Sequence, residues 1–194
     1  MTTESEQGHG EMRVIVITHA DAERRPEPRP LTKSGREHSR LAAERLKELI
    51  PDLRLKHIIS SPALRCRETA KLVASALGFP SVPITDAGAL EDPNPKNKGR
   101  AALREALASA EGHTDVIVCG HGDMANCFRD EITENGFARK PEGEREVIDK
   151  SYFLRGPAIV VFHGPRDGEW KIDAVEILEE GVAKSFTSVM SPTS

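Results

Sequence analysis

The chain has 194 residues, which is enough for one domain with a substantial core. Charged residues make up 30% of the sequence, apolar residues make up 38%, and the net charge is −4. These values are typical of a soluble globular protein and give no general attraction to nucleic acid.

Residues 1–11 are polar and acidic, unlike a signal peptide, and no stretch approaches the roughly 18 apolar residues of a membrane span. We therefore expect a cytoplasmic protein with no nucleic-acid or membrane partner. The three cysteines form no Cys-x-x-Cys motif, and the seven histidines show no metal-ligand spacing. No metal and no cofactor are expected.

Short apolar runs rich in β-branched residues predict buried strands. In chain order these strands are expected at 14–17, 57–59, 82–84, 115–119, 158–162 and 170–177. Between them, apolar spacing and end signals predict helices over 34–50, from Ser61 as N-cap to a stop at Gly78, over 100–110, and from Asp123 onward. The polar stretch 129–156 is expected to be a loop or a small helical cap.

Strands that alternate with helices and then close in a hairpin predict an α/β fold. We expect a three-layer sandwich with a mostly parallel sheet flanked by helices. The domain is expected to span residues 12–180, between a disordered tail at 1–11 and a flexible tail at 181–194.

Two histidines and an arginine follow predicted strand ends. His19 comes directly after the first strand, Arg65 lies in the first turns of the second helix, and His121 lies between two glycines. Carboxyl ends of parallel strands meet at one edge of a sheet, where ligands bind. An unprotonated His19 can attack phosphorus, Arg65 can hold phosphoryl oxygens, and a protonated His121 can stabilise the developing charge.

Three motifs give this pattern a family resemblance. Residues 18–20 read THA, residues 60–70 read SSPALRCRETA, and residues 119–122 read CGHG. In place and order they resemble the histidine phosphatase (phosphoglycerate mutase-like) superfamily, over about residues 13–162. The resemblance implies that superfamily's fold and a phosphohistidine intermediate. The short cap region favours the compact, SixA-like phosphohistidine phosphatase branch.

The first motif departs from the Arg-His-Gly of the family, because Thr18 stands where an arginine binds the phosphoryl group. Thr18 offers only a neutral hydroxyl, which is expected to contact the phosphoryl group. Arg29, placed before a Pro-Leu-Thr sequence, is expected to compensate as a phosphate-binding residue, with Arg24 and Arg25 as further candidates. Glu91 is the candidate general acid, with Asp92 as the alternative, although the compact branch of the family lacks this residue.

The sequence therefore predicts a metal-independent phosphatase, a phosphoric monoester hydrolase that works through a phosphohistidine. Its partner is expected to be a phosphorylated small molecule or a phosphoprotein. The alternative is a catalytically impaired member of the superfamily that binds an anion or a partner protein.

Overall fold

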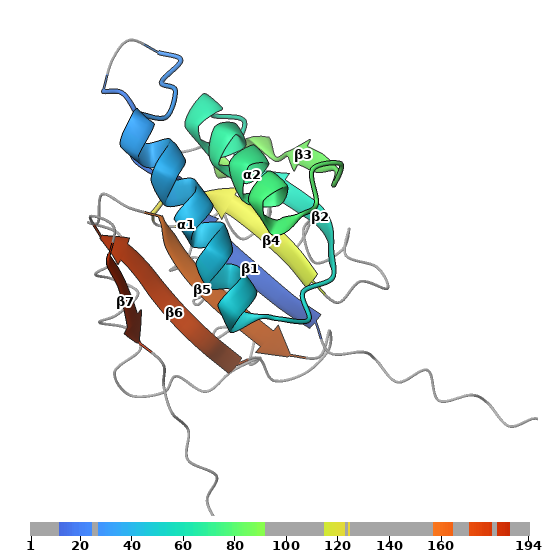
Figure 1. Ribbon diagram of the computed structural model, residues 1–194. Helices are drawn as coiled ribbons and strands as arrows, with labels where there is room; N and C mark the ends of the chain where they lie inside the picture. Colours follow the sequence, from blue (N-terminus) through green and yellow to red (C-terminus); the bar gives the residue numbers. More distant parts are fainter. Residues whose placement is uncertain are drawn as a thin grey trace, which may run out of the picture.

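The computed structural model describes residues 12–24, 27–91, 115–122, 124, 157–164, 171–179 and 182–186. In these ranges seven strands form one sheet, in the order β3-β2-β4-β1-β5-β6-β7. Two helices, α1 and α2, pack side by side over one face of it (Figure 1). The elements are β1 (Met12–Thr18), α1 (Lys33–Leu49), β2 (Leu55–Ser60), α2 (Leu64–Leu77), β3 (Ile84–Asp86), the 3-10 helix η1 (Gly88–Leu90), β4 (Asp115–Gly120), β5 (Ala158–Gly164), β6 (Lys171–Glu179) and β7 (Val182–Phe186).

The sheet has a parallel half and an antiparallel half. Strands β3, β2, β4 and β1 run parallel to one another, whereas β5, β6 and β7 pair antiparallel. The predicted α/β fold and the closing β5–β6 hairpin are confirmed. The helices expected over 100–110 and after Asp123, the cap at 129–156 and the tail at 1–11 lie outside the described ranges, apart from the single helical residue Met124.

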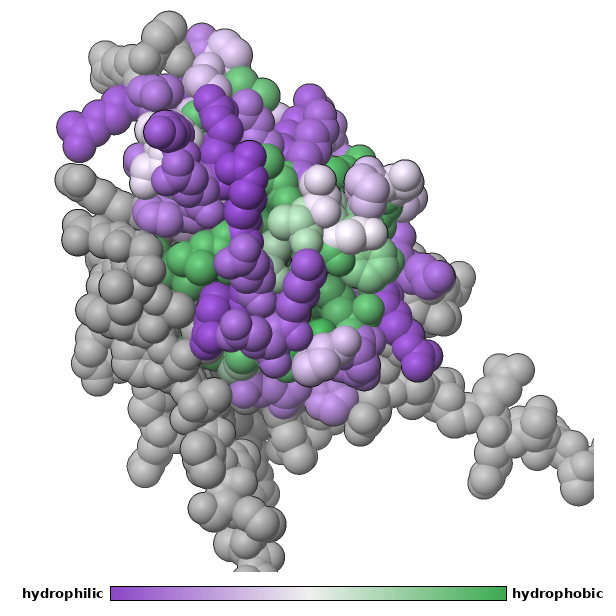
Figure 2. Space-filling model, viewed as in Figure 1, coloured by the Kyte–Doolittle hydropathy of each residue, from purple (hydrophilic) through white to green (hydrophobic). Residues whose placement is uncertain are grey.

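The core lies between the helices and the sheet. Ala42, Ala43 and Leu46 of α1 are fully buried against residues such as Ile15 and Ile117 of the central strands. Burying each large aliphatic side chain contributes about 1.5–3 kcal/mol, so this interface supplies much of the stability of the fold. The outer face over the helices is mostly hydrophilic, with apolar side chains visible between them (Figure 2).

The central strands β1, β4 and β5 are buried on both faces. Val16, Val118 and Val160, at consecutive positions across β1, β4 and β5, point away from the helices and are no more than 1% exposed. This burial explains the continuous β-branched runs in the sequence, since a strand with one solvated face would alternate apolar and polar residues.

Helix α1 begins where the preceding loop packs tightly against it. Thr32 is the N-cap residue, and its Oγ1 accepts the backbone N–H of Gly35 at 2.9 Å. The same hydroxyl donates to Oδ2 of Asp21 at 2.9 Å. A Cβ atom at Gly35 would lie 2.0 Å from the carbonyl oxygen of Asp21, so only glycine permits this contact.

Two sequence expectations about helix α2 have different outcomes. Gly78 ends α2 as predicted, with the positive φ of 92° that glycine tolerates. Ser61 as the N-cap is wrong: the helix begins at Leu64 and the cap residue is Ala63. The reason is that Ser61 continues from β2 into extended pairing, where its N–H donates to the carbonyl of Cys119 at 2.9 Å.

Two strand predictions also need correction. The strand expected at 82–84 lies at Ile84–Asp86, where Ile84, Thr85 and Asp86 pair with the end of β2. The flexible tail expected at 181–194 is wrong for β7, which pairs with β6. The register Glu179↔Val182 leaves two residues between the strands, the spacing of a tight hairpin.

The amino ends of β1 and β4 are joined by a buried ion pair, far along these strands from the histidines. Arg13 donates from Nε to Oδ1 of Asp115 at 2.6 Å and from Nη2 to Oδ2 at 3.0 Å. Asp115 is fully buried, and Asp52 takes the remaining Arg13 nitrogen at 2.7 Å. These carboxylates raise the pKa of Arg13.

Neither described helix is long and apolar enough to cross a membrane.

Candidate functional site

Three neighbouring strands end at the same edge of the sheet and bring the predicted residues together. His19 directly follows β1 and His121 directly follows β4, whose last residues, Thr18 and Gly120, are paired. Arg65 is the second residue of α2, which starts a few residues after β2. Because β2, β4 and β1 are adjacent and parallel, their carboxyl ends place all three side chains in one cluster.

The side chains of His19, Arg65 and His121 lie next to one another. Nε of Arg65 lies 3.3 Å from Nε2 of His19, and the rings of His19 and His121 meet edge to face, with centroids 5.3 Å apart and planes at 78°. The Arg65 side chain is only 14% exposed. A cation and two imidazoles in so small a space form a site suited to an oxyanion.

Hydrogen bonds fix the tautomer of His19. Its Nδ1 lies 2.8 Å from the carbonyl oxygen of Ala20, which can only accept, so Nδ1 carries the proton. Nε2 then keeps its lone pair and faces the donating Nε of Arg65. Burial lowers the pKa of His19, and the charges of Arg65 and Arg29 lower it further. The ring is therefore neutral near pH 7, as a nucleophile requires.

His121 is held by a serine that the sequence analysis did not connect to it. Oγ of Ser61 lies 3.2 Å from Nε2 of His121. Burial, followed by the charges of His19, Arg65 and Arg29, lowers the pKa of His121 to about 4. The free protein thus holds His121 neutral at pH 7, which differs from the protonated state expected from sequence. Burial is the main reason for the difference and the neighbouring cations add to it, and a bound anion would offset the cations.

Thr69 joins the two segments that carry His19 and Arg65. Its hydroxyl accepts the backbone N–H of Ala20 at 3.3 Å and donates to the carbonyl oxygen of Arg65 at 2.8 Å. Thr69 is fully buried. One hydroxyl therefore ties the residue after the histidine to the first turn of α2. The Thr-Ala end of the 60–70 motif was a signal for this residue, although not for this role.

Arg29 supplies a second cation near the histidines. Its charge lowers the pKa of both His19 and His121, and its side chain is 34% exposed. Glu27 lies on the same loop, with Oε1 at 2.7 Å from Nε of Arg29 and at 3.9 Å from Nη1 of Arg65. Of the other loop arginines, Arg24 is exposed and Arg25 lies outside the described residues.

Thr18 does not face the cluster. The residue is 4% exposed, and its Oγ1 accepts the backbone N–H of Ala158 at 2.8 Å. The expectation that this hydroxyl would contact phosphate is therefore corrected. The reason lies in the pairing of β1 with β5, because the side chain of Thr18 satisfies the first N–H of the neighbouring antiparallel strand.

Glu91 is the general acid expected from the sequence. It is exposed, just after η1, and its charge acts on Arg67, whose pKa is raised mainly by its hydrogen bonds to Asp86 and more weakly by Glu91. The structure thus places Glu91 beside an exposed ion pair. Asp92, the alternative acid, lies outside the described ranges.

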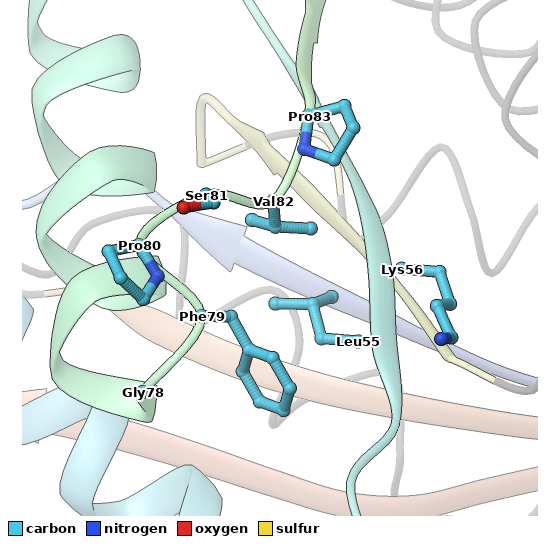
Figure 3. Close-up of a pocket in the computed structure, with 8 residues that line it drawn as sticks. All are labelled: Leu55, Lys56, Gly78, Phe79, Pro80, Ser81, Val82 and Pro83. Carbon is cyan, nitrogen blue, oxygen red and sulfur yellow. The ribbon is translucent and has the colours of Figure 1, made fainter.

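A pocket of about 380 Å³ lies at the opposite end of β2 (Figure 3). Its lining comes from the start of β2 and the turn after α2, with Phe79, Leu55 and Val82 facing one another. His19, Arg65 and His121 are not part of this lining.

Among the described residues, no three His, Cys, Asp or Glu side chains are placed to hold a metal ion.

Comparison with known proteins bears on the family resemblance and on the fold. Residues 9–92 match the model of the histidine phosphatase superfamily (branch 1), which confirms the resemblance seen in the sequence. No curated protein matches the chain.

Solved structures show the same fold at low identity. The protein histidine phosphatase SixA complexed with tungstate is 23% identical, with a TM-score of 0.63, over 84% of this chain and 96% of that one. A phosphoglycerate mutase from Plasmodium falciparum is 17% identical, with a TM-score of 0.60, over 95% and 98%. A mycobacterial glucosyl-3-phosphoglycerate phosphatase is 13% identical, with a TM-score of 0.58, over 84% and 98%. The phosphoglycerate mutase-like α/β fold is therefore established.

Proposed function

We propose that the protein is a metal-independent phosphatase that acts through a phosphohistidine at His19. The single observation that carries the proposal is the state of this imidazole: Nδ1–H donates to the carbonyl oxygen of Ala20, and the unprotonated Nε2 faces Nε of Arg65. An arginine beside a histidine lone pair brings a phosphoryl group and its nucleophile to the same place.

The reaction takes two displacements. First, the lone pair on Nε2 of His19 forms a bond to phosphorus while the bond from phosphorus to the leaving group breaks, and the leaving group keeps that electron pair and takes up a proton from the solvent. Then a water oxygen bonds to phosphorus as the Nε2–phosphorus bond breaks and the water loses a proton to the solvent, which releases inorganic phosphate and restores the imidazole. Arg65, Arg29 and His121 are assigned to the phosphoryl oxygens throughout.

The position of Glu91 bears on the substrate. An alkoxide leaving group needs a proton donor, whereas the imidazole of a phosphohistidine leaves with less help. Glu91 is exposed and its charge acts on Arg67, and it is not among the charges that shift the pKa of His19 or His121. This arrangement favours phosphohistidine on a protein over small phosphoesters, and both remain within the proposed substrate class.

The test compares a phosphorus–nitrogen and a phosphorus–oxygen substrate. We expect phosphoramidate to be hydrolysed faster than p-nitrophenyl phosphate, in the presence of a chelator, with activity lost in His19→Ala. Rapid quenching should trap an acid-labile, base-stable phosphate on His19. Activity that persists in His19→Ala, or label on Ser60 or Ser61, would refute the nucleophile.

One observation favours the alternative of an impaired member that binds an anion or a partner protein. The residue at position 18 is a neutral, buried threonine whose hydroxyl accepts the backbone N–H of Ala158, so this position offers the phosphoryl group no positive charge. Phosphate binding that depends on Arg65, without turnover or label on either substrate, would select this alternative.

A further inference from the structure

The carboxylate of Glu27 is placed between the two arginines of the site. Oε1 lies 2.7 Å from Nε of Arg29 and 3.9 Å from Nη1 of Arg65, and Oε2 accepts the backbone N–H of Arg29 at 3.1 Å. A carboxylate between two guanidinium groups uses the same contacts that a phosphoryl group makes. Glu27 therefore competes for the nitrogens that the proposed substrate needs.

The match between Glu27 and Arg29 is incomplete. Nε of Arg29 is buried, yet it makes no well-aligned hydrogen bond with any described group, although the carboxylate is near. A buried N–H without an aligned acceptor is costly and favours a ligand that can complete it. The Glu27 side chain is 67% exposed, so moving it into water costs little.

We propose that Glu27 is a specificity-determining residue, whose carboxylate holds Arg29 and Arg65 in the free protein and must be displaced by the phosphoryl group. A free phosphate ion gains only the contacts that Glu27 gives up. A phosphorylated protein gains further contacts outside the site, and these offset the displacement. Glu27 thus favours large phosphorylated substrates over inorganic phosphate, which is also the product. This inference rests on the proposed function.

The loop provides a matched control. Glu23 is exposed on the same loop, and the ion pairs of Arg29 and Arg65 among the described residues are with Glu27, so Glu23→Gln removes one charge without breaking such a pair. Calorimetric titration with inorganic phosphate measures affinity without depending on turnover. Glu27→Gln should bind phosphate about two- to fivefold more tightly, the factor for releasing an exposed ion pair. Glu23→Gln should change affinity less.

A double variant tests the cause. In an Arg29→Gln background, the gain from Glu27→Gln should shrink, because one of the two released cations is absent. Equal or weaker binding by Glu27→Gln overturns the inference, as does an equal gain in Glu23→Gln. If wild type binds phosphate but Glu27→Gln gains nothing, the inference alone fails. If Glu27→Gln gains affinity while no variant hydrolyses either substrate, the proposed function fails and the competition stands.

Discussion

The hydroxyl of Thr69 lies 3.3 Å from the backbone nitrogen of Ala20, and this contact connects helix α2 to the end of β1. Ala20 also provides the carbonyl that fixes the tautomer of His19. The position of the imidazole therefore depends on a residue that does not touch it.

Thr69→Val tests that dependence with little change in shape. Valine leaves the buried N–H of Ala20 without an acceptor, which should lower the free energy of unfolding by about 1–3 kcal/mol. We also expect kcat/KM to fall, because the loop that orients His19 is released. Thr69→Ser keeps the hydroxyl and should stay close to wild type. Urea unfolding and phosphoramidate hydrolysis measure the two effects, and equal values for the two variants would argue against the connection.

Arg65→Lys keeps a positive charge but loses the planar fork and the Nε donor to His19. We expect kcat/KM to fall about tenfold or more, which corresponds to at least about 1.4 kcal/mol of transition-state stabilisation. Arg67→Lys is the control two residues along α2, since Arg67 is an exposed residue paired with Asp86. If both lysine variants lose the same activity, Arg65 has no special role.

The pH dependence of stability follows from His121. Its pKa is about 4 in the folded protein and about 6.5 when unfolded, so the unfolded chain binds more protons between these values. The free energy of unfolding should therefore be highest above pH 6.5 and fall as the pH drops toward 4. In His121→Asn this slope should be shallower, with the lowered pKa of His19 still contributing. Parallel curves from urea unfolding at pH 4.5–7.5 would exclude His121 as a cause.

Thr18→Arg is expected to reduce stability rather than restore a phosphate fork. The position is buried and its hydroxyl serves the N–H of Ala158, so arginine brings an uncompensated charge and removes an acceptor. Thr18→Ser should be close to neutral. Thermal unfolding and kcat/KM for both variants are the measurements. A rise in kcat/KM for Thr18→Arg, with unchanged melting temperature, would mean that an arginine side chain can reach the histidines.

Sequence patterns predicted the parts of the fold that depend on periodicity. The β-branched runs of β1 and β4 reflect burial on both faces, and the edge shared by parallel strands follows from their order. The convergence of His19, Arg65 and His121 rests on that topology, and their catalytic roles stay predictions.

Contacts between distant side chains could not be predicted in this way. Serine is a residue type that commonly caps helices. The backbone bond from Ser61 to Cys119 instead keeps this residue in the extended segment before α2, where its Oγ lies near His121. Thr18 was read by its chemical type, whereas its environment is set by a strand 140 residues away. The pairing of β7 was missed because this short segment adjoins the Ser/Thr-rich end of the sequence.

Gly35 extends the influence of the loop that carries Glu27 and Arg29 into helix α1. Because a single methyl group there would overlap the carbonyl of Asp21, the loop and the helix fit only when that position bears a hydrogen. Gly35→Ala would therefore shift Glu27 and Arg29 while leaving the chemical identity of both side chains unchanged. In related chains, a side chain at this position would identify a loop that follows another path and presents different cations to the substrate.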